Sequence, residues 1–316
     1  RRILTHAIIE KLRVRNERMP KGIRKGLRSL DDAVTGKTFW ERFCRYVLNT
    51  SWDEDYTVTK EGVKQLDKAP RRVESLVREV VRRPSLFTEH VSRFVAAEGH
   101  RLFQFGFQLA HALNSQRIIE EVVSAQLLLP PGVQMEFTRG YFSGLKDSLP
   151  IAWESRVMQL LDDPSSRDVG TKIVYRCAMS ESVLKRLLVF LKAASAQAYV
   201  FGGLWLTAER DEISPSVIEE VVSCLRDSNT QEALAVAIEL TSYYFFSKER
   251  PKSCDEGLLF RLITADKFFQ DNPNQMVGYH WCTVTNGFRQ RFRDRDMEIL
   301  SVIMSHPECL IGSRSR

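Results

Sequence analysis

Apolar residues recur at spacings of three and four residues along nearly the whole chain. This spacing places them on one face of a helix and therefore indicates amphipathic helices. The pattern predicts an all-α fold class of about fourteen short helices. Clear runs are Val73–Val81, Ile118–Val123, Val183–Leu191 and Val217–Leu225.

The helical pattern also repeats along the chain. Residues 157–163 resemble residues 221–227, and helix starts expected at Ser148, Ser180 and Ser214 lie 32 and 34 residues apart. A period of roughly 33 residues is typical of helix pairs that stack on their neighbours to bury an apolar face. We therefore expect residues 1–316 to form a single helical-repeat domain, a right-handed α-solenoid of HEAT-like helix pairs. The alternative is a compact, irregular helical domain.

Several short sequence signals predict where helices begin. Capping boxes place a Ser or Thr three residues before a Glu or Gln, and a first-turn proline follows other caps. The predicted boxes are Thr38 with Glu41, Ser228 with Gln231 and Ser253 with Glu256, and the predicted cap–proline pairs are Asp163–Pro164 and Ser214–Pro215.

Strand-like patterns are limited to Thr57–Thr59 and Cys282–Thr285, the latter before the turn-forming pair Asn286–Gly287. No alternating partner strand follows that turn. We therefore expect that region to be helical.

The charge of the chain is concentrated at its N-terminal end. Arg1 to Arg28 contains ten Lys and Arg residues and two acids, while the whole chain has a net charge of +6. Smaller basic clusters follow, and cations aligned on one face would form a phosphate-binding track. Solvated helix faces are the favoured interpretation. The candidate binding residues are Arg13, Arg15, Arg18, Lys21, Arg24, Lys25, Arg28, Arg71, Arg72, Arg289 and Arg291.

No constellation of residues predicts catalysis. Gly36-Lys37-Thr38 resembles the end of a phosphate-binding loop but lacks the first glycine, so a turn with a helix cap is favoured. His90, His100 and His111 would lie about 15 Å apart along a helix, too far to share a metal ion. We expect no catalytic residue, no metal site and no cofactor.

No apolar stretch reaches the roughly 18 to 20 residues that a membrane span needs. The six cysteines are scattered and form no Cys-x-x-Cys pair, which is typical of buried thiols in a reducing cytoplasm. The chain begins at Arg1 in the middle of an amphipathic pattern, so we expect a fragment of a longer protein. We predict a cytoplasmic location and no membrane partner.

Four stretches resemble the C-terminal helical-repeat regions of large bacterial STAND-type P-loop NTPases, many of them linked to phage defence. They are Trp40–Val47, Gly140–Leu145, Tyr175–Ser180 and Tyr279–Trp281. The resemblance implies a sensor region that recognises a trigger, while the NTPase lies N-terminal to the repeats. It supplies no catalytic residue for this chain.

The expected function is therefore recognition of a protein partner by the inner surface of the solenoid, without catalysis. The alternative is sequence-independent nucleic-acid binding through the basic N-terminal helices. A third hypothesis is an enzyme on a helical-repeat scaffold, but no residue in the sequence supplies its acid or base. Salt dependence separates the first two, because phosphate contacts release counterions.

Overall fold

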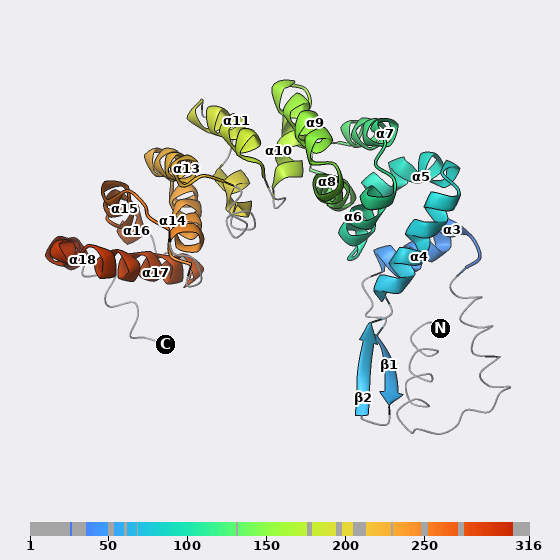
Figure 1. Cartoon of the computed structure of the whole chain (residues 1–316), viewed down its shortest axis with the longest axis horizontal. Helices are drawn as coiled ribbons and strands as arrows, with labels where there is room; N and C mark the ends of the chain where they lie inside the picture. The colour runs from blue at the N-terminus through green and yellow to red at the C-terminus, as the bar shows by residue number, and fades with distance from the viewer. Residues whose placement is uncertain are drawn as a thin grey trace. The chain divides into compact units, whose positions relative to one another are not determined.

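The computed structural model describes Gly26 and residues 36–49, 54–59, 62–67, 69–130, 132–175, 179–193, 198–204, 213–228, 230–247, 252–270 and 275–305. The chain divides into two compact units, residues 1–149 and 150–316. Helices make up the described secondary structure apart from one β hairpin (Figure 1). The predicted helical character is therefore confirmed for the described residues, and the hairpin is the exception.

The first unit begins its described part with α3 (Phe39–Phe43), which continues into a π-helical turn (Cys44–Leu48). Strands β1 (Glu54–Thr59) and β2 (Gly62–Asp67) follow. The longer helices are α4 (Ala69–Arg82), α5 (Ser85–Ala96), α6 (Leu102–Ala112), α7 (Gln116–Leu127) and α8 (Glu136–Ser148). Helix α6 packs against α4 and α8, and α5 packs against α7, so that this unit has two layers of helices (Figure 1).

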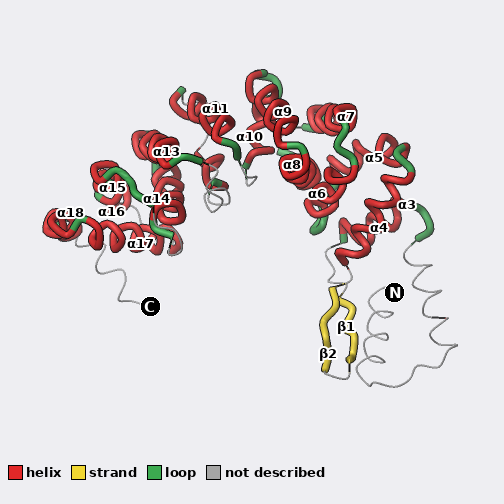
Figure 2. The backbone as a smooth tube through the Cα atoms, in the orientation of Figure 1, coloured by secondary structure: helices red, strands yellow, loops and turns green. Residues whose placement is uncertain are grey.

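The hairpin adds a small antiparallel sheet to the first unit (Figure 2). Glu54 lies opposite Asp67, and Thr59 lies opposite Gly62. The strand-like pattern at Thr57–Thr59 thus falls within β1. The second strand-like pattern, Cys282–Thr285, lies inside helix α17 (Gln275–Arg291), as predicted for a segment without a partner strand.

Helices α6 and α8 meet at glycines. A Cβ atom added at Gly140 would lie 2.1 Å from the carbonyl oxygen of Phe103, and one added at Gly106 would lie 2.4 Å from that of Phe137. Only a hydrogen atom fits at either position, because real Cβ atoms do not approach other atoms so closely. The two helix backbones therefore pack directly against each other.

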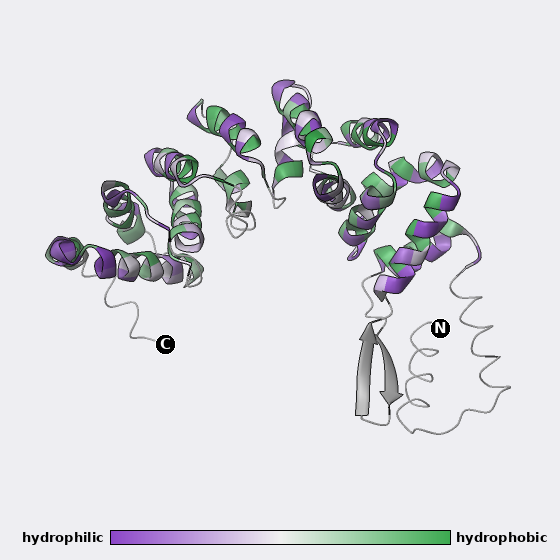
Figure 3. Ribbon diagram, viewed as in Figure 1, coloured by the Kyte–Doolittle hydropathy of each residue, from purple (hydrophilic) through white to green (hydrophobic). Residues whose placement is uncertain are grey.

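The second unit contains α9 (Pro150–Asp162), α10 (Arg167–Val174), α11 (Glu181–Lys192), a 3₁₀ segment (Ala198–Gly203), α13 (Pro215–Asp227), α14 (Gln231–Phe245), α15 (Glu256–Ile263), α16 (Lys267–Gln270), α17, a 3₁₀ turn (Arg293–Arg295) and α18 (Asp296–Met304). Helices α9, α11, α13 and α15 contact one another in chain order, while α14 packs against the 3₁₀ segment and α17. Hydrophobic and hydrophilic residues mix along these helices, as amphipathic packing requires (Figure 3).

Carboxylates connect the stacked helices α11, α13 and α15 of the second unit. Glu181 of α11 accepts the backbone N–H of Ser214, the residue before α13, at 2.9 Å. Glu219 of α13 accepts the backbone N–H of Asp255, the residue before α15, at 2.8 Å. Hydrogen bonds from Lys185 and Ser214 lower the pKa of the Glu181 carboxyl to about 2. The same type of contact therefore recurs between consecutive helix pairs.

A tyrosine contact recurs in both units. Tyr141 of α8 donates its phenol hydrogen to the carbonyl oxygen of Leu113, in the loop before α7, at 2.7 Å. Tyr244 of α14 donates likewise to Ile213, in the loop before α13, at 2.5 Å. In each case the tyrosine holds the loop that leads into the preceding helix.

Three predicted helix starts are confirmed. Thr38 and Glu41 form a reciprocal capping box at α3, since each side chain accepts the other residue's backbone N–H. Gly36 turns with a φ of 88°, as expected for a turn with a helix cap. Ser180 caps α11, and Ser214 precedes the first-turn proline of α13.

Two of the predicted capping boxes are wrong, because a nearby residue caps the helix instead. Thr230, not Ser228, accepts the backbone N–H of Ala233 at the start of α14. Asp255, not Ser253, caps α15. In each case a competing cap lies two residues closer to the helix, and hydrogen bonding at the first turn favours it.

The starts predicted at Asp163 and Ser148 are also wrong. Asp163 accepts the backbone N–H of Ser165 within a turn, and α10 begins only after Ser166. Ser148 ends α8, where its hydroxyl donates to the carbonyl oxygen of Gly144 at 2.8 Å. Serine and aspartate side chains also bond to nearby backbone in turns and near helix C-termini, so the residue type alone does not mark an N-cap.

Candidate binding surfaces

The basic N-terminal candidates lie outside the described residues. They are Arg13, Arg15, Arg18, Lys21, Arg24, Lys25 and Arg28.

The candidates on α4 are both described. Arg71 is exposed, while the guanidinium of Arg72 lies 4.7 Å from the ring centre of Tyr46. The next arginines of α4 and its C-terminal turn, Arg78 and Arg83, form ion pairs with glutamates four residues earlier. The helix therefore presents a mixed surface rather than a row of free cations.

The candidates near the end of α17 are engaged within the second unit. Arg289 pairs with Asp296 at 3.0 Å, and the guanidinium of Arg295 lies 3.8 Å from the ring centre of Phe260. Arg295 also pairs with Glu256 at 3.2 Å. These contacts hold the start of α18 against α15 and α17.

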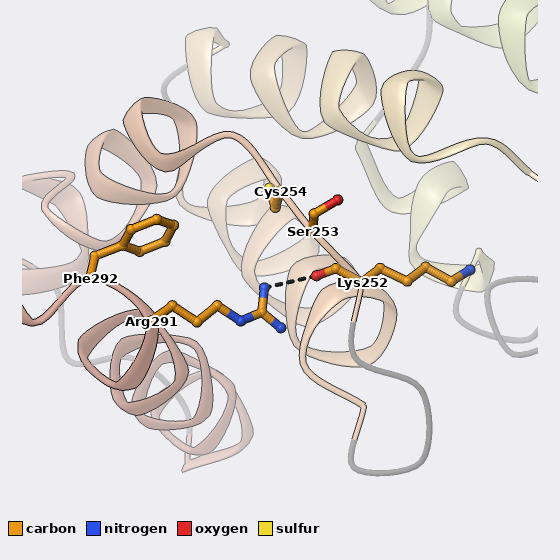
Figure 4. Close-up of a pocket in the computed structure, with 5 residues that line it drawn as sticks. All are labelled: Lys252, Ser253, Cys254, Arg291 and Phe292. Carbon is orange, nitrogen blue, oxygen red and sulfur yellow. Dashed lines mark hydrogen bonds between the residues drawn. The ribbon is translucent and has the colours of Figure 1, made fainter.

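Arg291 binds backbone instead of a carboxylate. Its guanidinium donates to the carbonyl oxygens of Phe245 and Lys252, at 2.7 and 2.8 Å, and lies 4.3 Å from the ring centre of Phe246. Figure 4 shows it reaching toward the Lys252 backbone beside a hollow of about 400 Å³. Burial raises the pKa of the nearby Cys254 thiol, which therefore stays protonated. Arg291 is an anchor for the segment after α14.

A charged cleft of about 630 Å³ opens between α3, α4 and α5 in the first unit. Glu79 pairs with Arg42 at 2.7 Å and with Arg83. Within the described part of the chain, Lys37 and Arg93 form no ion pair. The charged residues that line the cleft are Lys37, Arg42, Arg83, Arg93, Glu79 and Glu89.

Aromatic rings form one wall of this cleft. The guanidinium of Arg93 lies 3.8 Å from the ring centre of Trp40, and Trp40 stacks with Phe43 at 5.0 Å. His90 stacks on Phe39 at 5.6 Å, and its Nδ1 is buried without a hydrogen-bond partner in the structure as described. Sequence reasoning missed this cleft, because its residues come from separate segments. The closeness of Lys37 and Trp40 to a helix start was the only local signal.

The second unit exposes apolar side chains on its last helices. On α18, Met297, Leu300 and Met304 are 75%, 38% and 72% exposed, and their spacing places them on one face. On α17, Met276 and Tyr279 are 59% and 63% exposed. The spacing was visible in the sequence, but it is the same spacing that predicts a core stripe.

The aromatic residues with the strongest core pattern are buried. Tyr141, Phe142, Tyr244 and Phe245 are at most 1% exposed. These four residues therefore belong to the core. Their neighbours Tyr243 and Phe246 are half-buried.

Comparison with protein families, with curated proteins and with solved structures finds no match for this chain. Among the described residues, no group of three or more His, Cys, Asp and Glu side chains is arranged to hold a metal ion. None of the described helices has the length and apolar character needed to cross a membrane.

Proposed function

We propose that this chain is a non-catalytic helical-repeat module that recognises a protein partner. The observation that carries the proposal is the exposed face of Met297, Leu300 and Met304 on α18. Methionine is unbranched and polarizable, so it adapts to partners of different shape and is frequent on protein-binding surfaces. An apolar face of this kind suits a protein surface better than a phosphate backbone.

The repeat architecture that we propose is a right-handed α-solenoid of HEAT-like pairs. Two recurring contacts support it. The carboxylates of Glu181 on α11 and Glu219 on α13 each accept a backbone N–H just before the helix that stacks on theirs, and Tyr141 and Tyr244 each hold the loop that leads into the preceding helix. Equivalent contacts at equivalent positions are expected of stacked, related units.

Small-angle scattering tests this architecture. A compact domain of about 316 residues has a radius of gyration of roughly 20 Å, and stacked repeats should exceed that value. A radius of 20 Å or below, by the same scaling, would favour the compact alternative.

The biological role that we infer is that of a cytoplasmic sensor region of a bacterial STAND-type NTPase in antiphage defence. The resemblance of Trp40–Val47 and Tyr279–Trp281 to such regions motivates this role. Any NTPase activity would reside in another part of the protein.

Partner capture from phage-infected cells tests the proposed function. The bait is the full chain, compared with the triple variant Met297→Ser, Leu300→Ser, Met304→Ser and with the control Glu298→Gln, an exposed position on the same helix that lies off the face of these three residues. We expect the wild type and the control to retain one and the same protein. Its retention should be unaffected by nuclease treatment and should be lost with the triple variant.

The alternative function gives the opposite result. If the chain binds nucleic acid through its basic N-terminal helices, retention is removed by nuclease and is unaffected by the triple variant. Affinity for duplex DNA would then fall with salt at a log–log slope of about −0.9 per phosphate contacted.

A further inference from the structure

The cleft between α3, α4 and α5 carries a surplus of positive charge. Four cations and two glutamates line it, which gives a net charge of +2. Glu79 is shared by Arg42 and Arg83, while the side chains of Lys37 and Arg93 form no ion pair among the described residues; the Glu41 carboxylate accepts only the backbone N–H of Lys37. Two cations in the same cleft are therefore left for an external anion.

Arg93 is already oriented for such a contact. Its guanidinium lies over the ring of Trp40 at 3.8 Å, and a stacked guanidinium keeps its in-plane N–H groups free to bind a carboxylate in bidentate fashion. The ring restrains the long side chain, so that less rotamer freedom is lost when a ligand binds. The cleft thus offers one fixed cation, Arg93, and one mobile cation, Lys37.

We propose that this cleft docks an acidic peptide segment of the protein partner, with its carboxylates bound by Lys37 and Arg93. The proposal rests on the proposed function and adds the chemistry of the segment that is recognised. The volume of about 630 Å³ holds a few side chains, and a surplus of +2 matches two carboxylates.

The wall of the cleft favours a peptide over a nucleic acid. Single-stranded nucleic acids bind where aromatic rings are free to stack on bases beside a continuous basic groove. Here Trp40 already stacks with Phe43 and Arg93, and Glu79 and Glu89 interrupt the basic lining. A chain of phosphodiesters would face both glutamates, whereas separate carboxylates can avoid them.

The test uses acetylated, amidated hexaglutamate as the probe, with hexaglutamine as the neutral control. Binding to the full chain is measured by fluorescence anisotropy at fixed low salt. We expect hexaglutamate to bind and hexaglutamine not to bind. The double variant Lys37→Gln, Arg93→Gln should weaken hexaglutamate binding by about tenfold or more.

The matched control is Arg82→Gln. Arg82 is exposed, lies on α4 next to Arg83 and does not line the cleft, so its removal lowers the net charge without changing the site. We expect the affinity of Arg82→Gln to stay within about twofold of the wild type. An unchanged near-ultraviolet circular dichroism spectrum verifies that the variants are folded.

Three results would overturn the proposal. The first is no binding of hexaglutamate at about 1 mM. The second is an equal loss of binding free energy per charge removed in Arg82→Gln, which removes one charge, and in the double variant, which removes two; this result indicates attraction by net charge alone. The third is tighter binding of oligothymidylate than of hexaglutamate, lost in the same double variant, which assigns the cleft to phosphodiesters.

The outcome is separable from that of the proposed function. A chain that captures a protein through α18 but ignores hexaglutamate refutes the cleft assignment alone. A chain that binds hexaglutamate through Lys37 and Arg93 but captures no protein refutes the proposed function, while the preference of the cleft for acidic peptides stands.

Discussion

At the α6–α8 contact in the first unit, two helix backbones meet at Gly106 and Gly140, whereas in the second unit Arg291 joins α17 to the segment after α14. The first contact is a direct approach of backbone atoms, and the side chain of Arg93 in the same unit forms no ion pair in the described structure. At the second contact the arginine is part of the fold. Basic clusters that look alike in a sequence can therefore have different physical roles.

The largest expected effect is at the glycine contact. Gly140→Ala should destabilise the first unit by about 3 kcal/mol, because its Cβ would lie 2.1 Å from the Phe103 carbonyl oxygen and the helices would have to separate. Urea unfolding followed by circular dichroism measures the change.

The matched control for Gly140→Ala is Gly278→Ala on α17, where an added Cβ meets no atom within 4 Å. This variant should gain about 0.5 to 1 kcal/mol, because alanine restricts the unfolded chain and favours helix. If both substitutions destabilised the protein equally, the close backbone contact between α6 and α8 would not be the cause of the loss at Gly140.

A smaller effect is expected at the arginine anchor. Arg291→Met should cost about 2 to 3 kcal/mol, since it leaves the carbonyl oxygens of Phe245 and Lys252 without their donor. Arg93→Met, which removes an exposed arginine stacked on Trp40, should change stability by about 0.5 kcal/mol or less. Urea unfolding measures the free energy of unfolding of both variants. Similar losses would show that Arg291 does not stabilise the fold more than Arg93 does.

The smallest expected effect is a pH dependence at His280. This imidazole is 3% exposed and lies between the rings of Tyr243 and Tyr279, and burial lowers its pKa from the ordinary value of 6.5. The unfolded chain therefore binds a proton that the folded chain does not. Stability should be complete above about pH 6.5 and should fall as the pH decreases below that value.

The measurement compares the unfolding free energy of the wild type and of His280→Phe at about pH 7 and pH 5. We expect the wild type to lose more stability on acidification. Burial raises the pKa of Glu239, which gives a contribution of opposite sign, but this contribution is common to both proteins. Equal acid sensitivity would show that His280 is protonated freely in the folded state.

Much of the helical architecture could be predicted from the sequence. The apolar spacing identified helices such as α11 and α13, because a period of 3.6 residues is set by the backbone itself. The exact starts were less predictable, as Ser228 and Thr230 show. Both residues can cap a helix, and only the fold decides that Ser228 ends α13 while Thr230 begins α14.

The candidate surfaces were less accessible to sequence reasoning. Arg93 and Arg291 look alike in the sequence, and only their three-dimensional neighbours separate a cation without a carboxylate from one bound to two carbonyls. The same limit applies to Met297 and Met304. Their spacing predicts burial, and exposure depends on which helix, if any, packs against them.

The glycine contact between α6 and α8 has a consequence for local opening of the first unit. Because the backbones touch at Gly106 and Gly140, neither helix can expose its central amides to solvent unless the two separate. The amides in the central turns of α6 (Leu102–Ala112) and α8 (Glu136–Ser148) should therefore exchange with deuterium at one common opening free energy, as a single cooperative unit.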